Sequence, residues 1–124
     1  MREIPRGEWA EFLDGFSRQH EGWLVTVEVF GEEIGAQVEA EEMALAGVSA
    51  DLKGGGEGVI SIILGKGSTE RVTHNIARPT HVRIEQAESG ADMALQIESG
   101  GGTTTLVRFR SAVLPEMVDG VVFE

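Results

Sequence analysis

The residues most able to do chemistry are the three histidines, because imidazole serves as a general base or a metal ligand near neutral pH. Two of them, His74 and His81, lie seven residues apart in "RVTHNIARPTHVRIEQ", residues 71–86, with an Arg-Pro pair between them. The pair could form one catalytic or metal site. It could equally belong to two strands and a turn that happen to contain histidine.

The alternation of side chains along the predicted strands places the two histidines on opposite faces of the sheet. His74 alternates in phase with Val72 and Ile76, which predicts that it points to the apolar face of a sheet. His81 is out of phase with Val82 and Ile84, so we expect it to face solvent opposite Glu98. Side chains on opposite faces of a sheet cannot bind one ion, and no metal site is predicted.

The inward position of His74 has two interpretations. It could be a buried base or ligand-binding group in a cavity, or a neutral core histidine that is hydrogen-bonded to backbone, water or a helix end. The functional interpretation needs a second polar group inside, and Gln86 is the nearest candidate. His20 follows a predicted helix, where its protonated form would favour the helix C-terminus.

The outward face carries a second set of candidates. The expected registers align one polar residue from each of five strands, and these are either an ordinary polar ladder or a ligand or partner surface: Asp51, Ser61, Asn75, Arg83 and Gln96. A serine–histidine–acid mechanism needs an imidazole within about 3 Å of the hydroxyl. His81 lies too far along the sheet for that, so no catalytic residue is predicted.

Two apolar residues, Ile63 and Leu106, break the outward polarity. The strand "VISIILG", residues 59–65, is apolar on both faces. Either the C-terminal tail covers its outer face, or that face binds a partner or a second copy of the chain.

Two periodicities define the elements that must position these residues. Residues 5–19 are expected to form a helix with one apolar stripe at Trp9, Phe12, Leu13 and Phe16. After Trp23 the period falls to two, and short turn-like linkers favour antiparallel neighbours. The predicted strands are 23–30, 35–40, 48–53, 59–65, 71–77, 81–88, 91–99 and 103–111.

Turn lengths then set the pairing. A turn at Ser89-Gly90 places Ile84 opposite Leu95, and a turn at 100–102 places Leu95 opposite Val107. A turn at 78–80 would place His74 beside Ile84, and "GGGEG" would place Ala50 beside Ile62. We therefore predict an α+β fold in which an N-terminal helix packs on a strongly curved, roughly eight-stranded antiparallel meander, either open or barrel-like. Residues 1–124 are expected to form one domain, with 112–124 as a docking tail.

Composition limits the classes of partner that we expect this protein to bind. The net charge of −11 disfavours nucleic acid and anionic membranes. The chain has no cysteine, and we see neither a secretion signal nor an apolar run long enough to span a bilayer, which favours the cytoplasm. The glycine runs 54–56 and 100–102 lack the GK[ST] ending of a phosphate loop, so no cofactor is predicted.

Several segments together resemble a known family: "REIPRGEWAEFLDGFSRQHEGWLVTVEV", "GAQVEA", "RPTHVRIEQ" and "GTTTLVRFRS". They are similar to a family of small uncharacterised bacterial proteins, classed as a domain of unknown function. The resemblance covers nearly the whole chain and implies a bacterial origin with no assigned activity.

The function expected from the sequence is that of a non-catalytic binding or protein-interaction domain, with an unknown protein or a second copy as partner. The alternative is a small-molecule-binding protein or enzyme with a pocket near His74.

Overall fold

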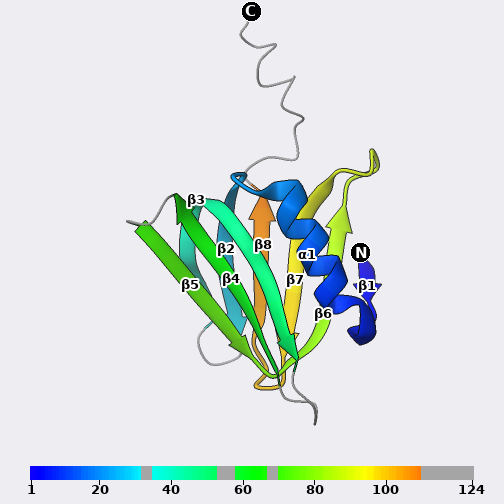
Figure 1. Ribbon diagram of the computed structural model, residues 1–124. Coiled ribbons are helices and arrows are strands. Elements are labelled where there is room, and N and C mark those ends of the chain that lie inside the picture. Colours follow the sequence, from blue (N-terminus) through cyan, green and yellow to red (C-terminus); the bar gives the residue numbers. More distant parts are fainter. Residues whose placement is uncertain (32–34, 53–57, 67–69, 110–124) are drawn as a thin grey trace, which may run out of the picture.

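The computed structural model describes residues 1–31, 35–52, 58–66 and 70–109 (Figure 1). It contains a 3₁₀ turn at Arg6–Glu8, the helix α1 at Trp9–His20 and eight strands. The strands are β1 Arg2–Ile4, β2 Leu24–Gly31, β3 Gly35–Leu52, β4 Gly58–Lys66, β5 Glu70–Ala77, β6 Pro79–Gln86, β7 Asp92–Ser99 and β8 Thr104–Phe109. No helix in these ranges is both long and apolar enough to cross a membrane.

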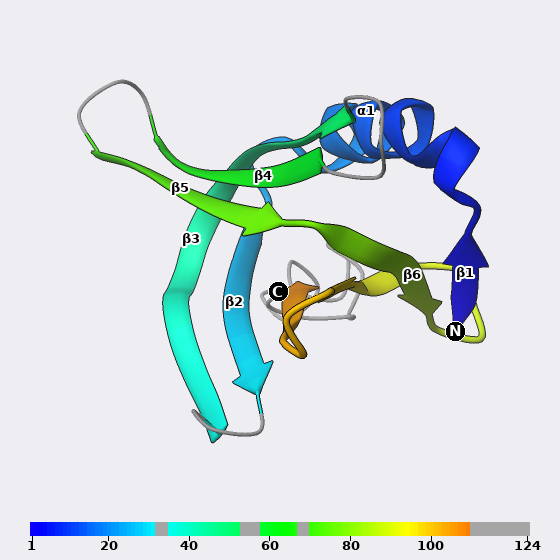
Figure 2. The ribbon, with the colours of Figure 1, turned by 90° about the horizontal axis from the view of Figure 1, so that it is seen from below.

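The strands form one antiparallel sheet in the order β1-β6-β7-β8-β2-β3-β4-β5. The sheet is strongly curled, so that β4 and β5 lie across from β2, β8 and β7 (Figure 2). It is not closed, because β1 and β5 form its two edges. The predicted fold class, one helix on a curved antiparallel sheet, is confirmed.

The strand β3 corrects one prediction. We expected separate strands at 35–40 and 48–53, but β3 runs unbroken from Gly35 to Leu52, because the linking segment "EEMALAG" contains no residue that must end a strand. Its first half pairs with β2 and its second half with β4. The change of partner, between Ala44 and Leu45, lies after Glu42, whose φ is 51°, and just before a register shift between Leu45 and Gly47.

The segment between β5 and β6 also differs from the prediction. The expected hairpin at 78–80 is wrong, because β5 pairs with β4 while β6 pairs with β1 and β7. Arg78 instead turns a corner with a left-handed φ of 52°. Its N–H donates to the Gly58 carbonyl and its carbonyl accepts from the Gly100 N–H, each at 2.9 Å. His74 therefore does not lie beside Ile84, and one long meander becomes two shorter ones.

The N-terminus differs from the expected helix at 5–19. Residues 2–4 form β1, which pairs with β6 and is too short to show a period. Pro5 then precedes the 3₁₀ turn, and α1 begins only at Trp9.

The helix α1 covers one side of the curled sheet. Its residues Trp9, Leu13 and Phe16 are buried in a core shared with both halves of the sheet, as the apolar stripe predicted. Ser17 fixes the helix to β3, because its Oγ accepts from the Val48 N–H at 2.8 Å and lies 2.9 Å from the Val48 carbonyl. The hydroxyl therefore bonds to the part of β3 that no longer pairs with β2.

The predicted registers hold where two-residue and glycine turns set them. Ile84 pairs with Leu95, and Leu95 with Val107. Across β4 and β5, Ile62 pairs with His74. The pairing of Ala50 was wrong by two residues: Ala50 faces Ile60, because β3 ends at Leu52 and β4 begins at Gly58, each one residue earlier than expected.

Candidate functional site

A pocket of about 280 Å³ opens between β5 and the β2–β8 pair. It lies where the curled sheet brings β5 across from β2 and β8 without pairing them (Figure 2). Its volume falls just below the roughly 300–1,000 Å³ usual for ligand pockets. The lining residues are Val29, His74, Asn75, Ile76, Ala77, Arg78, Ser99, Gly101, Thr103 and Thr105.

His74 brings an imidazole to this pocket. It sits on β5 opposite the fully buried Ile62, so the prediction that it points inward is confirmed. The ring is half-buried and has no hydrogen-bond or ion-pair partner among the described residues. His20 and His81 both have such partners.

Thr105 is the second polar group that the sequence reasoning required and missed. It lies on β8 between Val29 and Ile97, and only 3% of it is exposed. Its hydroxyl has no partner among the described residues, yet no side-chain oxygen there is both sealed from solvent and unbonded. The hydroxyl therefore reaches open space, and the pocket supplies it. Its phase with Val107 and Phe109 could have revealed the inward position.

The β7–β8 turn completes the lining. Ser99 and Thr103 hold each other there through their hydroxyl oxygens, 2.7 Å apart. Arg78 enters from the β5–β6 corner. The lining is therefore rich in groups that donate hydrogen bonds, and it contains no carboxylate in the part of the chain that the structure describes.

Gln86 lies away from His74. Its amide donates to Asp92 Oδ1 at 2.8 Å, at the opposite end of β6 from the corner that follows β5. The structure therefore does not bring the two predicted ligand-binding residues together, because β6 turns away from β5 instead of pairing with it.

The predicted outward row divides into two parts. Ser61 donates to Asn75 Oδ1 at 2.7 Å, and Arg83 faces Gln96 across β6 and β7. Asp51 faces Val59 rather than Ser61. The missing β5–β6 pair places Asn75 and Arg83 in different parts of the sheet, so the five residues form no single surface.

The two outward apolar residues are each half-buried. Ile63 lies on β4 between Gly47 and Thr73, and Leu106 lies on β8 between Glu28 and Gln96. The tail proposed to cover Ile63, residues 112–124, falls outside the described residues.

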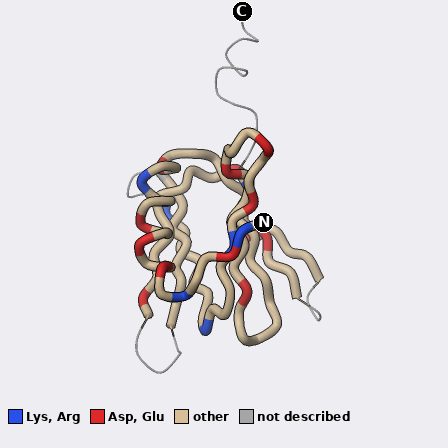
Figure 3. The backbone as a smooth tube through the Cα atoms, turned by 90° about the vertical axis from the view of Figure 1, so that its right-hand side faces the viewer, with Lys and Arg blue, Asp and Glu red and all other residues tan. Residues whose placement is uncertain are grey.

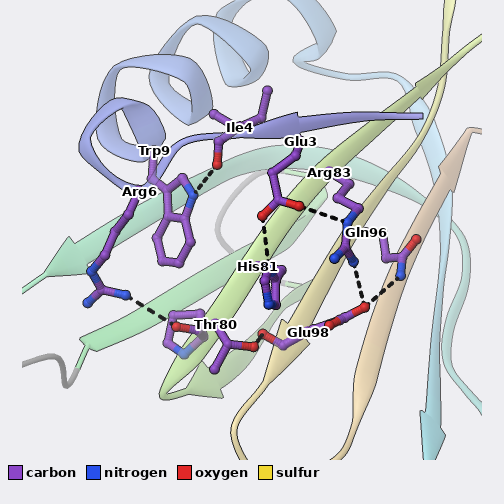
Figure 4. A network of polar contacts seen from close by, with 10 residues as sticks. Glu3, Ile4, Arg6, Trp9, Thr80, His81, Arg83, Gln96 and Glu98 are labelled. Atoms are coloured by element: carbon purple, nitrogen blue, oxygen red, sulfur yellow. Dashed lines mark hydrogen bonds and ion pairs between the residues drawn. The ribbon is translucent and has the colours of Figure 1, made fainter.

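His81 belongs to a polar network on the outer face of β1, β6 and β7 (Figure 4). It faces Glu98 in register as predicted, but its Nδ1 lies 2.7 Å from Glu3 on β1. Arg83 donates to Glu3 at 3.1 Å and to Glu98 at 2.5 Å. The hydrogen bond from His81 and the charge of Arg83 lower the pKa of Glu3 below its usual 4.5. This network holds the edge strand β1 to the sheet. Because His81 bonds to Glu3, its side chain is not free for a ligand.

The network predicts a pH dependence. Because folding depresses the pKa of Glu3, its stabilising contribution is present above pH 4.5 and is lost as pH falls through the folded-state value. Urea denaturation of wild type and Glu3→Gln should show a gap at about pH 5.5 that shrinks towards about pH 3. Glu88→Gln, at an exposed residue without a described partner, is the control. A gap that stays constant over this range contradicts the assignment.

His20 is buried at the end of α1, where both of its ring nitrogens lie close to oxygen atoms of the protein. Its Nδ1 lies 2.8 Å from the Phe16 carbonyl and its Nε2 lies 3.3 Å from Asp92. Its ring stacks on Phe109 with centroids 4.6 Å apart. Both nitrogens face oxygen acceptors, so the side chain joins α1 to β7 and is not free for a ligand.

Two features bear on the chemistry open to His74. Among the described residues no carboxylate lines the pocket to orient the imidazole, and the lining hydroxyls of Ser99 and Thr103 are bonded to each other. Within the described ranges no group of three or more His, Asp or Glu side chains is placed to hold a metal ion.

Comparison with known proteins agrees with the resemblance seen in the sequence. Residues 1–117 match a family described as a family of unknown function, DUF5335. An uncharacterized protein of the bacterium Aquifex aeolicus (strain VF5) is 31% identical over 116 residues, which cover 93% of this chain and 97% of that protein. No solved structure matches the chain significantly. The chain belongs to the DUF5335 family, whose function is unknown.

Proposed function

We propose that this protein is a non-catalytic domain that binds a small molecule in the pocket beside His74. One observation carries the proposal: two inward polar side chains, His74 and Thr105, line the same pocket and have no partner among the described residues. Neither group is sealed from solvent, since no described side-chain nitrogen or oxygen is both buried and unbonded. Both can therefore bond a small molecule that enters the pocket.

The surroundings of the two groups support the same proposal. Val29 and Ile76 add apolar contact area, and polar groups placed on an apolar wall are typical of small-molecule sites. The lack of cysteine supports a cytoplasmic location, which we propose with it.

The proposal predicts opposite effects of Thr105→Val on stability and on binding. Valine keeps the shape of threonine and removes an unbonded hydroxyl, so the free energy of unfolding should rise by about 1 kcal/mol. Chemical denaturation followed by circular dichroism measures this change. Thr104→Val, one residue away on the other face of β8, is the matched control and should change stability by less than about 0.5 kcal/mol. A loss of stability in Thr105→Val would mean that the hydroxyl has a structural partner.

Binding is tested by the ring signals of the three histidines. Protein with labelled histidine is titrated with small aromatic fragments that include benzoate, benzamide and benzylamine. At least one fragment should shift the His74 signals and leave those of His20 and His81 unchanged, and Thr105→Val should weaken that response. The proposal fails if no fragment shifts the His74 signals at millimolar concentration.

Protein interaction is a second candidate function, favoured by several exposed apolar side chains on the outer face of β2, β3 and β8. Phe30 is 37% exposed, Val38 is 57% exposed, and Leu106 shares their face of the sheet. We would expect this surface to associate with a second copy of the chain. Sedimentation analysis of wild type and Val38→Glu tests it: a wild type that stays monomeric at high concentration removes this candidate.

A further inference from the structure

The charge of the pocket lining differs from that of the whole protein. The chain carries 21 acidic and 10 basic residues, and acidic positions recur around the described backbone (Figure 3). The described lining of the pocket includes Arg78 and His74 and no acidic residue. A second pocket, beside α1, is by comparison lined by Glu11 and Asp92 as well as Arg18. The pocket is therefore a locally basic site on an acidic protein.

Arg78 differs from most of the described arginines because its guanidinium has no protein partner among the described residues. Arg18, Arg83 and Arg108 each pair with a carboxylate, and the Arg6 guanidinium lies 4.8 Å from the centre of the Trp9 ring. Arg78 has no ion pair, side-chain hydrogen bond or ring contact among the described residues. A guanidinium without a partner presents a planar set of donors that matches a carboxylate or a phosphate.

The backbone of Arg78 supplies a second, independent observation. Its φ of 52° lies in the left-handed region, where glycine or asparagine is the ordinary choice. Two backbone hydrogen bonds, to Gly58 and from Gly100, hold it there. An arginine in this conformation stores strain that glycine would relieve, and such strain is concentrated at functional sites. The side chain therefore contributes something that the turn itself does not need.

We propose that the ligand of this pocket carries a carboxylate or phosphate group, which Arg78 binds by charge while His74 and Thr105 donate hydrogen bonds to it. The inference rests on the proposed function and adds the chemical class of the ligand. Charge-assisted bonds of this kind are short and strong. The volume of 280 Å³ corresponds to about nine water molecules at roughly 30 Å³ each, so the ligand is a small metabolite-sized anion.

The experiment compares probes that differ mainly in charge. Benzoate and its neutral isostere benzamide, and separately inorganic phosphate, are titrated at constant ionic strength while the His74 ring signals are followed. We expect benzoate or phosphate to bind at least tenfold more tightly than benzamide, and the arm that binds identifies the anion. If benzamide binds as tightly as either anion, the inference fails and the proposed function stands. If no probe or fragment shifts His74, both fail.

Variants of Arg78 separate its charge from its structural place. Arg78→Gln should weaken anion binding at least tenfold and leave benzamide binding unchanged. Arg71→Gln, at an exposed arginine on β5 that lies outside the lining and has no partner among the described residues, should change neither. Arg78→Gly suits the left-handed backbone, so it should raise the melting temperature and still lose anion affinity. Unchanged anion affinity in a folded Arg78→Gly protein overturns the assignment.

Discussion

Replacing Trp9 with alanine is expected to lower the free energy of unfolding by about 3–5 kcal/mol, the usual cost of removing a large aromatic side chain from a core. Trp9 is only 1% exposed, and its Nε1–H donates to the Ile4 carbonyl at 2.8 Å (Figure 4). The indole thereby joins α1 to β1. Its loss leaves both a cavity under the helix and a carbonyl without its donor.

Chemical denaturation followed by circular dichroism measures the effect, and Trp23→Ala provides the matched control. Trp23 packs against His20 and Phe109 but is 43% exposed, so its truncation should cost less than half as much as that of Trp9. A loss below about 1 kcal/mol for Trp9→Ala would show that α1 is not anchored as described.

Replacing His74 with leucine is expected to stabilise the protein and to weaken binding in the pocket. The half-buried imidazole gains no hydrogen bond from the described residues, whereas leucine would extend the apolar contacts of Ile62 and Ile76. The free energy of unfolding should rise by about 1 kcal/mol, because leucine buries more apolar area there than the imidazole does. Affinity for the fragments that shift His74 should fall at least tenfold, which corresponds to about 1.4 kcal/mol.

His81→Leu is the control variant for this experiment. His81 contacts Glu3, so its replacement removes an interaction and should not stabilise the fold. The affinity of the pocket fragments, measured with Thr105 as the reporter signal, should stay unchanged. If His74→Leu loses stability as His81→Leu does, His74 has a structural role and the proposed function is wrong.

Local sequence signals predicted much of the sheet. Alternation placed Ile84, Leu95 and Val107 in the same row, because two short turns left few registers that keep apolar residues together. The same alternation placed His74 inside and His81 outside. These predictions needed only the period of two and the turn lengths.

The errors arose where tertiary contacts override the local signal. The "RPT" segment has the length of a hairpin loop, but hydrogen bonds from Gly100 and to Gly58, both distant in the sequence, hold Arg78 in a corner. That corner separates Gln86 from His74 and opens the pocket between β5 and β8. Thr105 could have been found from its phase with Val107, whereas its position across from His74 depends on how far the sheet curls.

A crystal structure of the protein soaked with benzoate and benzamide tests the central claim most directly, since it shows what occupies the pocket. We predict a bound molecule within hydrogen-bonding distance of both His74 and Thr105, with the carboxylate of benzoate turned towards Arg78. A pocket filled by side chains of the protein itself, with His74 and Thr105 bonded to them, would contradict the account.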